Sequence, residues 1–188
     1  MKIQIFLLTF ILSSLQALPT PHHLQPQVKI VGGRLTSIEV HPYIGSIQLE
    51  GFGHFCGASI VSRTFMLTAA HCLKGKKYFD LEVRLGSSFN DRNATIFRVK
   101  RIIQHAAYDN VTQDFDFALL ELKEPINFTK SMRPVKLPAR NQEFSVGTET
   151  LAAGWGKTSS TLRQIKNPIY SQQLCNDKKK KKITDRML

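Results

Sequence analysis

The sequence predicts an all-β protein built from short antiparallel strands. Between residues 43 and 122, six apolar segments of strand length are separated by glycine, asparagine and aspartate turns, with no long helical period. Short strands at this spacing are typical of an antiparallel barrel or sandwich. The expected strands are 43–49, 54–61, 65–69, 81–85, 96–103 and 117–122.

A second, smaller group of strands is expected after Pro125. Its candidate strands are 135–137, 148–155, 162–165 and 183–188, with a short helical turn at 171–177. The second group has about half as many strands as the first, and the 188 residues are few for an all-β domain, which often runs to roughly 200–250. The sequence therefore predicts one complete unit and one incomplete unit.

The first 29 residues are expected to lie outside the fold. Residues 1–17 combine Met1-Lys2 with an apolar run and small residues before Ala17, the pattern of a secretory signal peptide. The run is too short to cross a membrane, and no other segment reaches that length. Residues 18–29 are rich in Pro, His and Gln and resemble an extended pro-segment. We therefore expect a secreted protein with no membrane partner.

The charge of the chain is strongly positive. Lys and Arg number 26 against 14 Asp and Glu, a formal charge of +12, and one run of five lysines occupies 178–182. Such a run predicts either an anionic partner such as a sulfated glycan or a solvated loop. No aromatic residue interleaves with the lysines, which disfavours nucleic acid.

The cysteines and the potential N-glycosylation sites are consistent with a secreted protein. The chain has three cysteines, an odd number, so at least one lacks a partner within it. Disulfides persist in the secretory compartment. Asn93, Asn110 and Asn127 each begin an Asn-x-Ser/Thr sequence, and we expect them in surface loops that can be glycosylated.

His71 is the first candidate catalytic residue. It leaves the end of an apolar strand in Leu67-Thr68-Ala69-Ala70-His71-Cys72, and Cys56 lies 16 residues before Cys72. A bridge between the two cysteines would hold the turn of His71 against the neighbouring strand and stabilise the fold by roughly 3 kcal/mol. A general base must be held in hydrogen-bond reach of its nucleophile, so a fixed position suits that role.

Asp116 is the expected partner of His71. It precedes the apolar segment Phe117-Ala118-Leu119-Leu120. A carboxylate that enters a buried strand needs a partner, because desolvation is otherwise costly. Such an acid fixes the imidazole tautomer. Asp114 is the competing candidate, but its position favours a loop.

Two further segments show patterns that are less specific for a function than those around His71 and Asp116. In Lys29-Ile30-Val31-Gly32-Gly33, cleavage after Lys29 would free a new ammonium group on Ile30, which the glycines would allow to swing inward. Residues 153–158 form a tight, glycine-flanked strand end around Trp155.

Taken in order, these segments resemble the landmarks of the trypsin/chymotrypsin family of serine endopeptidases, from Ile30 to the end of the chain. The landmarks are Ile30-Val31-Gly32-Gly33, Leu67-Thr68-Ala69-Ala70-His71-Cys72, Asp116-Phe117-Ala118-Leu119-Leu120 and Gly154-Trp155-Gly156. The resemblance implies two six-stranded antiparallel barrels with an active site between them, the first complete and the second incomplete here. It also implies His71 as general base and acid, Asp116 as its orienting carboxylate, and a Cys56–Cys72 bridge.

The same resemblance implies a peptidase domain over 30–188, an activating protease that cuts after Lys29, and protein or peptide substrates. We expect a monomer without cofactor or metal. Some family members bind calcium through glutamates in a loop that corresponds to 87–95, and that loop here holds Asp91 but no glutamate. Cys175 matches the first half of a second family bridge, whose partner would follow Leu188, so it is expected to be unpaired.

The family's nucleophile lies in a Gly-Asp-Ser-Gly-Gly segment, which residues 1–188 do not contain. The oxyanion hole belongs to the same segment. We therefore expect the chain to be a C-terminally truncated protease and to be inactive as it stands, because both nucleophile and oxyanion donors are required. The alternative is a non-catalytic protease homologue that binds a protein or an anionic glycan.

Overall fold

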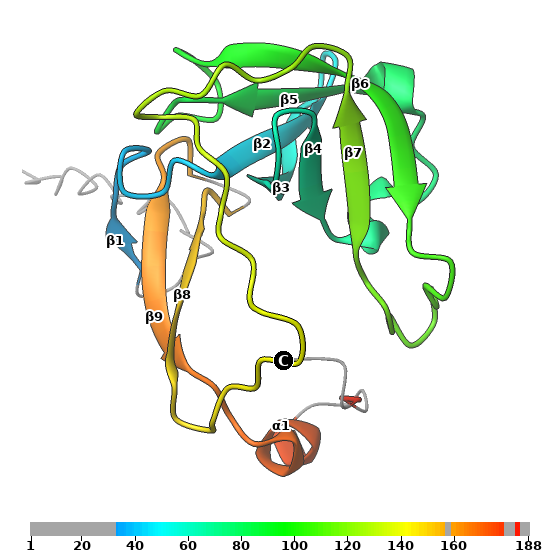
Figure 1. Ribbon diagram of the computed structural model, residues 1–188, viewed down its shortest axis with the longest axis vertical. Helices are drawn as coiled ribbons and strands as arrows, with labels where there is room; N and C mark the ends of the chain where they lie inside the picture. Colours follow the sequence, from blue (N-terminus) through cyan, green and yellow to red (C-terminus); the bar gives the residue numbers. More distant parts are fainter. Residues whose placement is uncertain (1–32, 157–158, 179–182, 185–188) are drawn as a thin grey trace, which may run out of the picture.

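A computed structural model describes residues 33–156, 159–178 and 183–184, and it contains a closed barrel and a separate three-stranded sheet (Figure 1). All strand pairs are antiparallel, and the barrel order is β2-β3-β4-β7-β6-β5. The barrel strands are β2 (Ile44–Leu49), β3 (Gly53–Ile60), β4 (Phe65–Thr68), β5 (Leu81–Leu85), β6 (Thr95–Gln104) and β7 (Ala118–Leu122). The predicted all-β fold, with the first barrel complete and the second incomplete, is confirmed.

Alternating apolar residues build the barrel core. In β7, Ala118, Leu120 and Leu122 are buried, whereas the residues between them are half-buried. This alternation places every second side chain inside the barrel. Gly45 lies where the barrel leaves no room for a side chain, since a Cβ there would collide with the side chain of Leu85. Apolar periodicity was therefore sufficient to find all six barrel strands.

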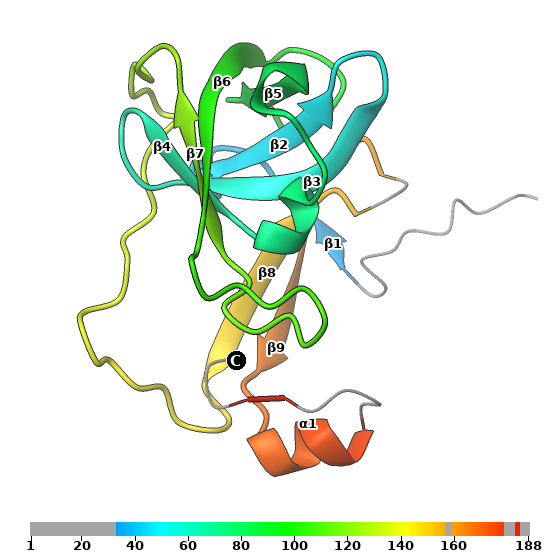
Figure 2. The ribbon, with the colours of Figure 1, turned by 90° about the vertical axis from the view of Figure 1, so that its right-hand side faces the viewer.

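The second sheet is smaller and has the order β1-β9-β8. It comprises β1 (Arg34–Leu35), β8 (Glu149–Gly154) and β9 (Arg163–Pro168). The sequence predicted β8 and β9 but not β1, which is only two residues long. The helical turn predicted at 171–177 is α1 (Gln172–Lys178), at the far end of this sheet (Figure 2).

The strand predicted at 135–137 is wrong. This segment belongs to a connection without strands that runs from the barrel to the second sheet (Figure 1). Val135 donates one backbone hydrogen bond to Ile60 O at 2.8 Å, but Pro134 and Pro138 flank the segment. Proline has no N–H to continue a ladder, so pairing stops there. Residues 183–184 are also not in a strand, and the rest of the strand predicted to end at 188 lies outside the described residues.

Trp155 joins the second sheet to the barrel. Its side chain is 2% exposed and packs with Ile38, Ile44 and Leu162. The indole Nε1 donates a hydrogen bond to Ser88 O at 3.0 Å. The glycine-flanked strand end around Trp155 therefore connects the two sheets.

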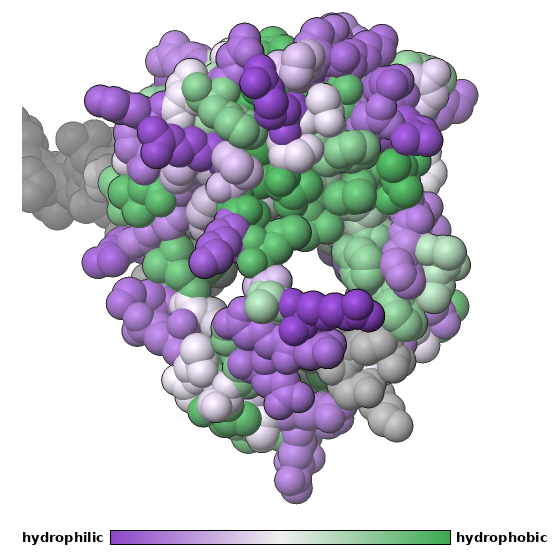
Figure 3. All heavy atoms as spheres, viewed as in Figure 1, coloured by the Kyte–Doolittle hydropathy of each residue, from purple (hydrophilic) through white to green (hydrophobic). Residues whose placement is uncertain are grey.

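The second sheet is poorly covered among the described residues. Glu149 to Ala152 in β8 are exposed, and Leu151 keeps 40% of its surface. The space-filling view shows a hollow between the barrel and the lower part of the molecule, with apolar residues along its upper edge (Figure 3). None of the helices in the described part of the chain combines the length and apolar character of a membrane crossing.

Candidate active site

His71 lies in a 3₁₀ turn directly after β4. The turn, η1 (Ala70–Leu73), buries Ala70 and Leu73 in the barrel core. Because these two apolar anchors point inward, the side chain of His71 between them points outward and is 50% exposed. The strand end and the turn together fix the ring at the rim of the barrel.

A disulfide holds this turn to β3. Cys72 is bonded to Cys56, with the two Cα atoms 6.2 Å apart, which is the bridge that the family resemblance implied. The bridge ties the turn to a strand that also pairs with β4 through Ser59 and Leu67. The position of His71 is thus fixed both by the sheet and by a covalent link.

Asp116 reaches His71 because β4 and β7 are paired. Thr68, the last residue of β4, lies opposite Ala118, the first residue of β7. Antiparallel pairing brings the two residues before β7, Asp116 and Phe117, close to the turn that follows β4. Asp116 therefore sits beside His71 although the two are 45 positions apart.

The carboxylate of Asp116 contacts two atoms of His71. Oδ2 lies 2.6 Å from the ring Nδ1, and Oδ1 accepts a hydrogen bond of 2.8 Å from the backbone N–H. An ionised carboxylate only accepts hydrogen bonds, so in the neutral imidazole the proton lies on Nδ1 and Nε2 has a free lone pair. Nε2 lies 3.6 Å from Cys72 Sγ and has no oxygen partner among the described residues. This arrangement leaves Nε2 available as a base.

The loop before β7 is held in an unusual conformation. Gln113 and Phe115 have φ angles of 62° and 52°, a region that costs a residue with a side chain about 1–3 kcal/mol. Phe115 and Phe117 both pack on the ring of His105, with centroids 4.8 and 4.6 Å away. No specific role was predicted for His105 from the sequence, and the Phe-Asp-Phe pattern around Asp116 was the feature that could have indicated this packing.

Three potential metal ligands cluster here, but their chemistry does not suit a metal. The side-chain ligand atoms of Cys56, His71 and Cys72 all lie within 4.8 Å of one another. Both sulfurs belong to the disulfide, so neither is the thiolate that metal binding requires.

The other residues singled out from the sequence lie elsewhere. Cys175 is a free, half-buried cysteine in α1. The side chains of all three sequon asparagines are exposed, and these residues are Asn93, Asn110 and Asn127. Lys29 and Ile30, the signal and pro-segments and most of the lysine run lie outside the described residues.

A closed six-stranded barrel beside a partial second sheet, joined through a buried tryptophan, defines a trypsin-like fold. The chain belongs to the Trypsin family, whose model matches residues 30–188.

Individual relatives agree with this assignment. Trypsin 5G1 of Aedes aegypti is 39% identical over 154 residues, which cover 79% of this chain and 58% of that protein. A trypsin of Simulium vittatum is 38% identical, over 78% of this chain and 63% of its own length. The chain spans between 58% and 67% of the length of these and two further curated relatives.

Among solved structures, the scabies mite inactivated protease paralogue S-D1 has a similar fold. It matches with a TM-score of 0.73 and 27% identity, and the match covers 78% of this chain and 65% of that one.

Proposed function

We propose that this chain is the greater part of a secreted trypsin-like serine endopeptidase. His71 is the general base and acid, and Asp116 is the carboxylate that orients it. The observation that carries the proposal is the double contact of Asp116, on Nδ1 at 2.6 Å and on the backbone N–H at 2.8 Å. It leaves Nε2 free for proton transfer, which is what acyl transfer by a serine requires.

Residues 1–188 do not themselves supply the nucleophile. No Gly-Asp-Ser-Gly-Gly segment is present in them, and no serine hydroxyl contacts His71 within the described residues. The chain 1–188 therefore has a base without a nucleophile, and we propose that it hydrolyses no peptide ester or amide. Turnover by purified 1–188 that a serine-directed phosphonate blocks would contradict this.

The activation and secretion steps belong to the same proposal. Residues 1–17 are the signal peptide, and an activating protease cuts after Lys29. The exposure of Asn93, Asn110 and Asn127 supports glycosylation of the secreted protein. Amino-terminal sequencing of the protein from culture medium tests both steps. A start near residue 18 before activation and at Ile30 afterwards is expected, whereas retention of Met1 would contradict them.

A second candidate is a non-catalytic homologue that acts by binding. The similarity to an inactivated protease paralogue favours it, together with the lack of a nucleophile in 1–188. The two candidates differ in what the transcript encodes after Leu188. A following Gly-Asp-Ser-Gly-Gly segment establishes the protease, and a stop codon in abundant message establishes the homologue.

The binding candidate also predicts a use for the lysine run at 178–182. Salt-sensitive retention on heparin that is lost when these lysines become alanine would support an anionic glycan partner. Unchanged retention of the alanine variant on heparin would indicate that the lysine run is a solvated loop.

A further inference from the structure

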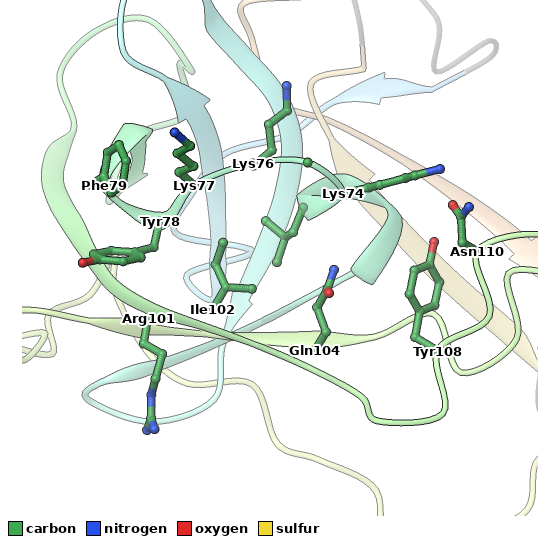
Figure 4. Close-up of a pocket in the computed structure, with 12 residues that line it drawn as sticks. Lys74, Lys76, Lys77, Tyr78, Phe79, Arg101, Ile102, Gln104, Tyr108 and Asn110 are labelled. Carbon is green, nitrogen blue, oxygen red and sulfur yellow. The ribbon is translucent and has the colours of Figure 1, made fainter.

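A pocket of about 630 Å³ lies beside the turn that carries His71 (Figure 4). One wall is the segment from Leu73 to Phe79, which ends within η2 (Tyr78–Asp80), and the other is β6 with the loop that follows it. The amide of Gln104 in β6 donates a hydrogen bond of 3.3 Å to Ala70 O, so the pocket is tied to the His71 turn. A volume of this size lies within the range of about 300–1,000 Å³ that is typical of ligand-binding pockets.

The first wall is positively charged. Lys74, Lys76 and Lys77 line the pocket, and none of the three takes part in an ion pair within the described residues. Arg101 on the opposite wall is different, because it pairs with Glu121 at 2.6 Å. The lining contains no carboxylate. The ammonium groups of Lys76 and Lys77 lie 5.7 and 5.5 Å from the ring centroids of Phe55 and Phe79, contacts that do not neutralise their charge. The charge that remains for a ligand is therefore that of the three lysines, with Lys74 the one that has no ring contact of this kind.

Two exposed aromatic rings lie next to these lysines. Tyr78 and Phe79 are 44% and 56% exposed and contact each other edge to face, with centroids 5.4 Å apart. Lys77 Nζ lies 5.5 Å from the Phe79 ring centroid. Exposed aromatic rings are enriched at surfaces that bind protein segments, since the rings bury a large area on contact.

Tyr108 adds an unused hydrogen-bond donor. Its side chain lines the pocket, and its hydroxyl is buried without a partner among the described residues. Burial, followed by the charges of Asp116 and Asp109, raises the pKa of Tyr108, so the hydroxyl stays protonated. In Figure 4 the polar ends of Lys74, Tyr108 and Asn110 are drawn at the same end of the pocket, so docking there requires Asn110 to be free of glycan. A buried donor without an acceptor is costly, and a ligand carboxylate would satisfy it.

From this combination we propose that the pocket docks an acidic peptide segment of a partner protein. Carboxylates of the segment meet Lys74, Lys76 and Lys77 and accept from Tyr108, while an aromatic or aliphatic side chain packs on Tyr78 and Phe79. A sulfated glycan would satisfy the lysines but would leave the aromatic pair unused. The docking does not involve the imidazole of His71, so it goes beyond the proposed hydrolysis and does not depend on it.

The test measures binding of a short fluorescein-labelled peptide, in which glutamates flank phenylalanines, to the full chain by fluorescence anisotropy. The triple variant Lys74→Ala/Lys76→Ala/Lys77→Ala should bind about 10-fold more weakly, since three charge contacts are lost. Tyr108→Phe, which removes only the hydroxyl, should weaken binding about 5-fold. The variant Tyr78→Ala/Phe79→Ala should weaken it as well.

The matched control is Lys123→Ala/Lys130→Ala/Lys136→Ala, which removes the same charge from exposed lysines outside the pocket. It should change the affinity by less than about 2-fold. Equal losses in the two triple variants would overturn the proposal, because binding would then reflect net charge alone. Displacement of the peptide by heparin, with no effect of the aromatic variant, would also overturn it in favour of a glycan site.

Discussion

At the scale of single residues, the two contacts of Asp116 with His71 differ in what they control. The Nδ1 contact sets the ring tautomer, and the backbone contact sets where the turn lies relative to the carboxylate. The sequence was sufficient to nominate both residues, because each stands at the end of an apolar strand. It could not predict the positive φ of Phe115 or the stacking on His105, which depend on tertiary packing.

His54 should make stability depend on pH. Its Nδ1 contacts Ser46 Oγ at 2.8 Å, and burial lowers its pKa below the ordinary 6.5. At His54 the unfolded chain therefore binds a proton more readily than the folded one, so the contribution of His54 to the free energy of unfolding is constant above about pH 6.5 and falls below it. Urea unfolding at about pH 7 and pH 5 should show a smaller loss for His54→Gln than for the wild type. Parallel losses in the two proteins would contradict this.

The disulfide should contribute measurably to stability. Replacing Cys56 and Cys72 together by serine should lower the free energy of unfolding by about 3 kcal/mol, because the unfolded chain regains the entropy of an open loop. Urea denaturation measures the change. Cys175→Ser is the matched control, since Cys175 is free and only half-buried, and it should leave the midpoint nearly unchanged. If Cys175→Ser lost as much unfolding free energy as the double variant, the loss could not be attributed to the disulfide.

At the scale of elements, apolar alternation predicted the barrel strands because each has one face in a closed core. The same reasoning failed at 135–137, where an apolar segment between Pro134 and Pro138 looks like a strand but cannot form a ladder. It also missed β1, because two residues carry no period. A strand as short as β1, which exists because it pairs with the distant β9, is one that periodicity does not find.

The barrel core and the second sheet should respond differently to truncation of a leucine. Leu120 in β7 is fully buried, so Leu120→Ala should cost about 2–5 kcal/mol in unfolding free energy. Leu151 in β8 is 40% exposed, so Leu151→Ala should cost less than about 1 kcal/mol. Urea titrations of the two variants compare them directly, and a larger cost at Leu151 would show that β8 is covered in solution.

At the scale of the whole molecule, the two sheets should differ in local stability. The barrel is closed and encloses the larger core, whereas most of β8 is exposed. Amides in poorly buried elements exchange through low-energy local opening. Hydrogen exchange followed by mass spectrometry should therefore show slow exchange in peptides from β2, β5 and β7 and faster exchange in β8. Uniform protection across both sheets would contradict this difference.

The proton NMR spectrum of the chain tests most directly whether Asp116 holds a protonated Nδ1 of His71. A strongly downfield Nδ1–H resonance is expected in the wild-type protein, because hydrogen bonds to a carboxylate are short and strong. The resonance should disappear in His71→Gln and should lose its downfield position in Asp116→Asn, while the rest of the spectrum shows an intact barrel. An unchanged resonance in Asp116→Asn, or none in a folded wild-type chain, would contradict the pairing on which the proposed function rests.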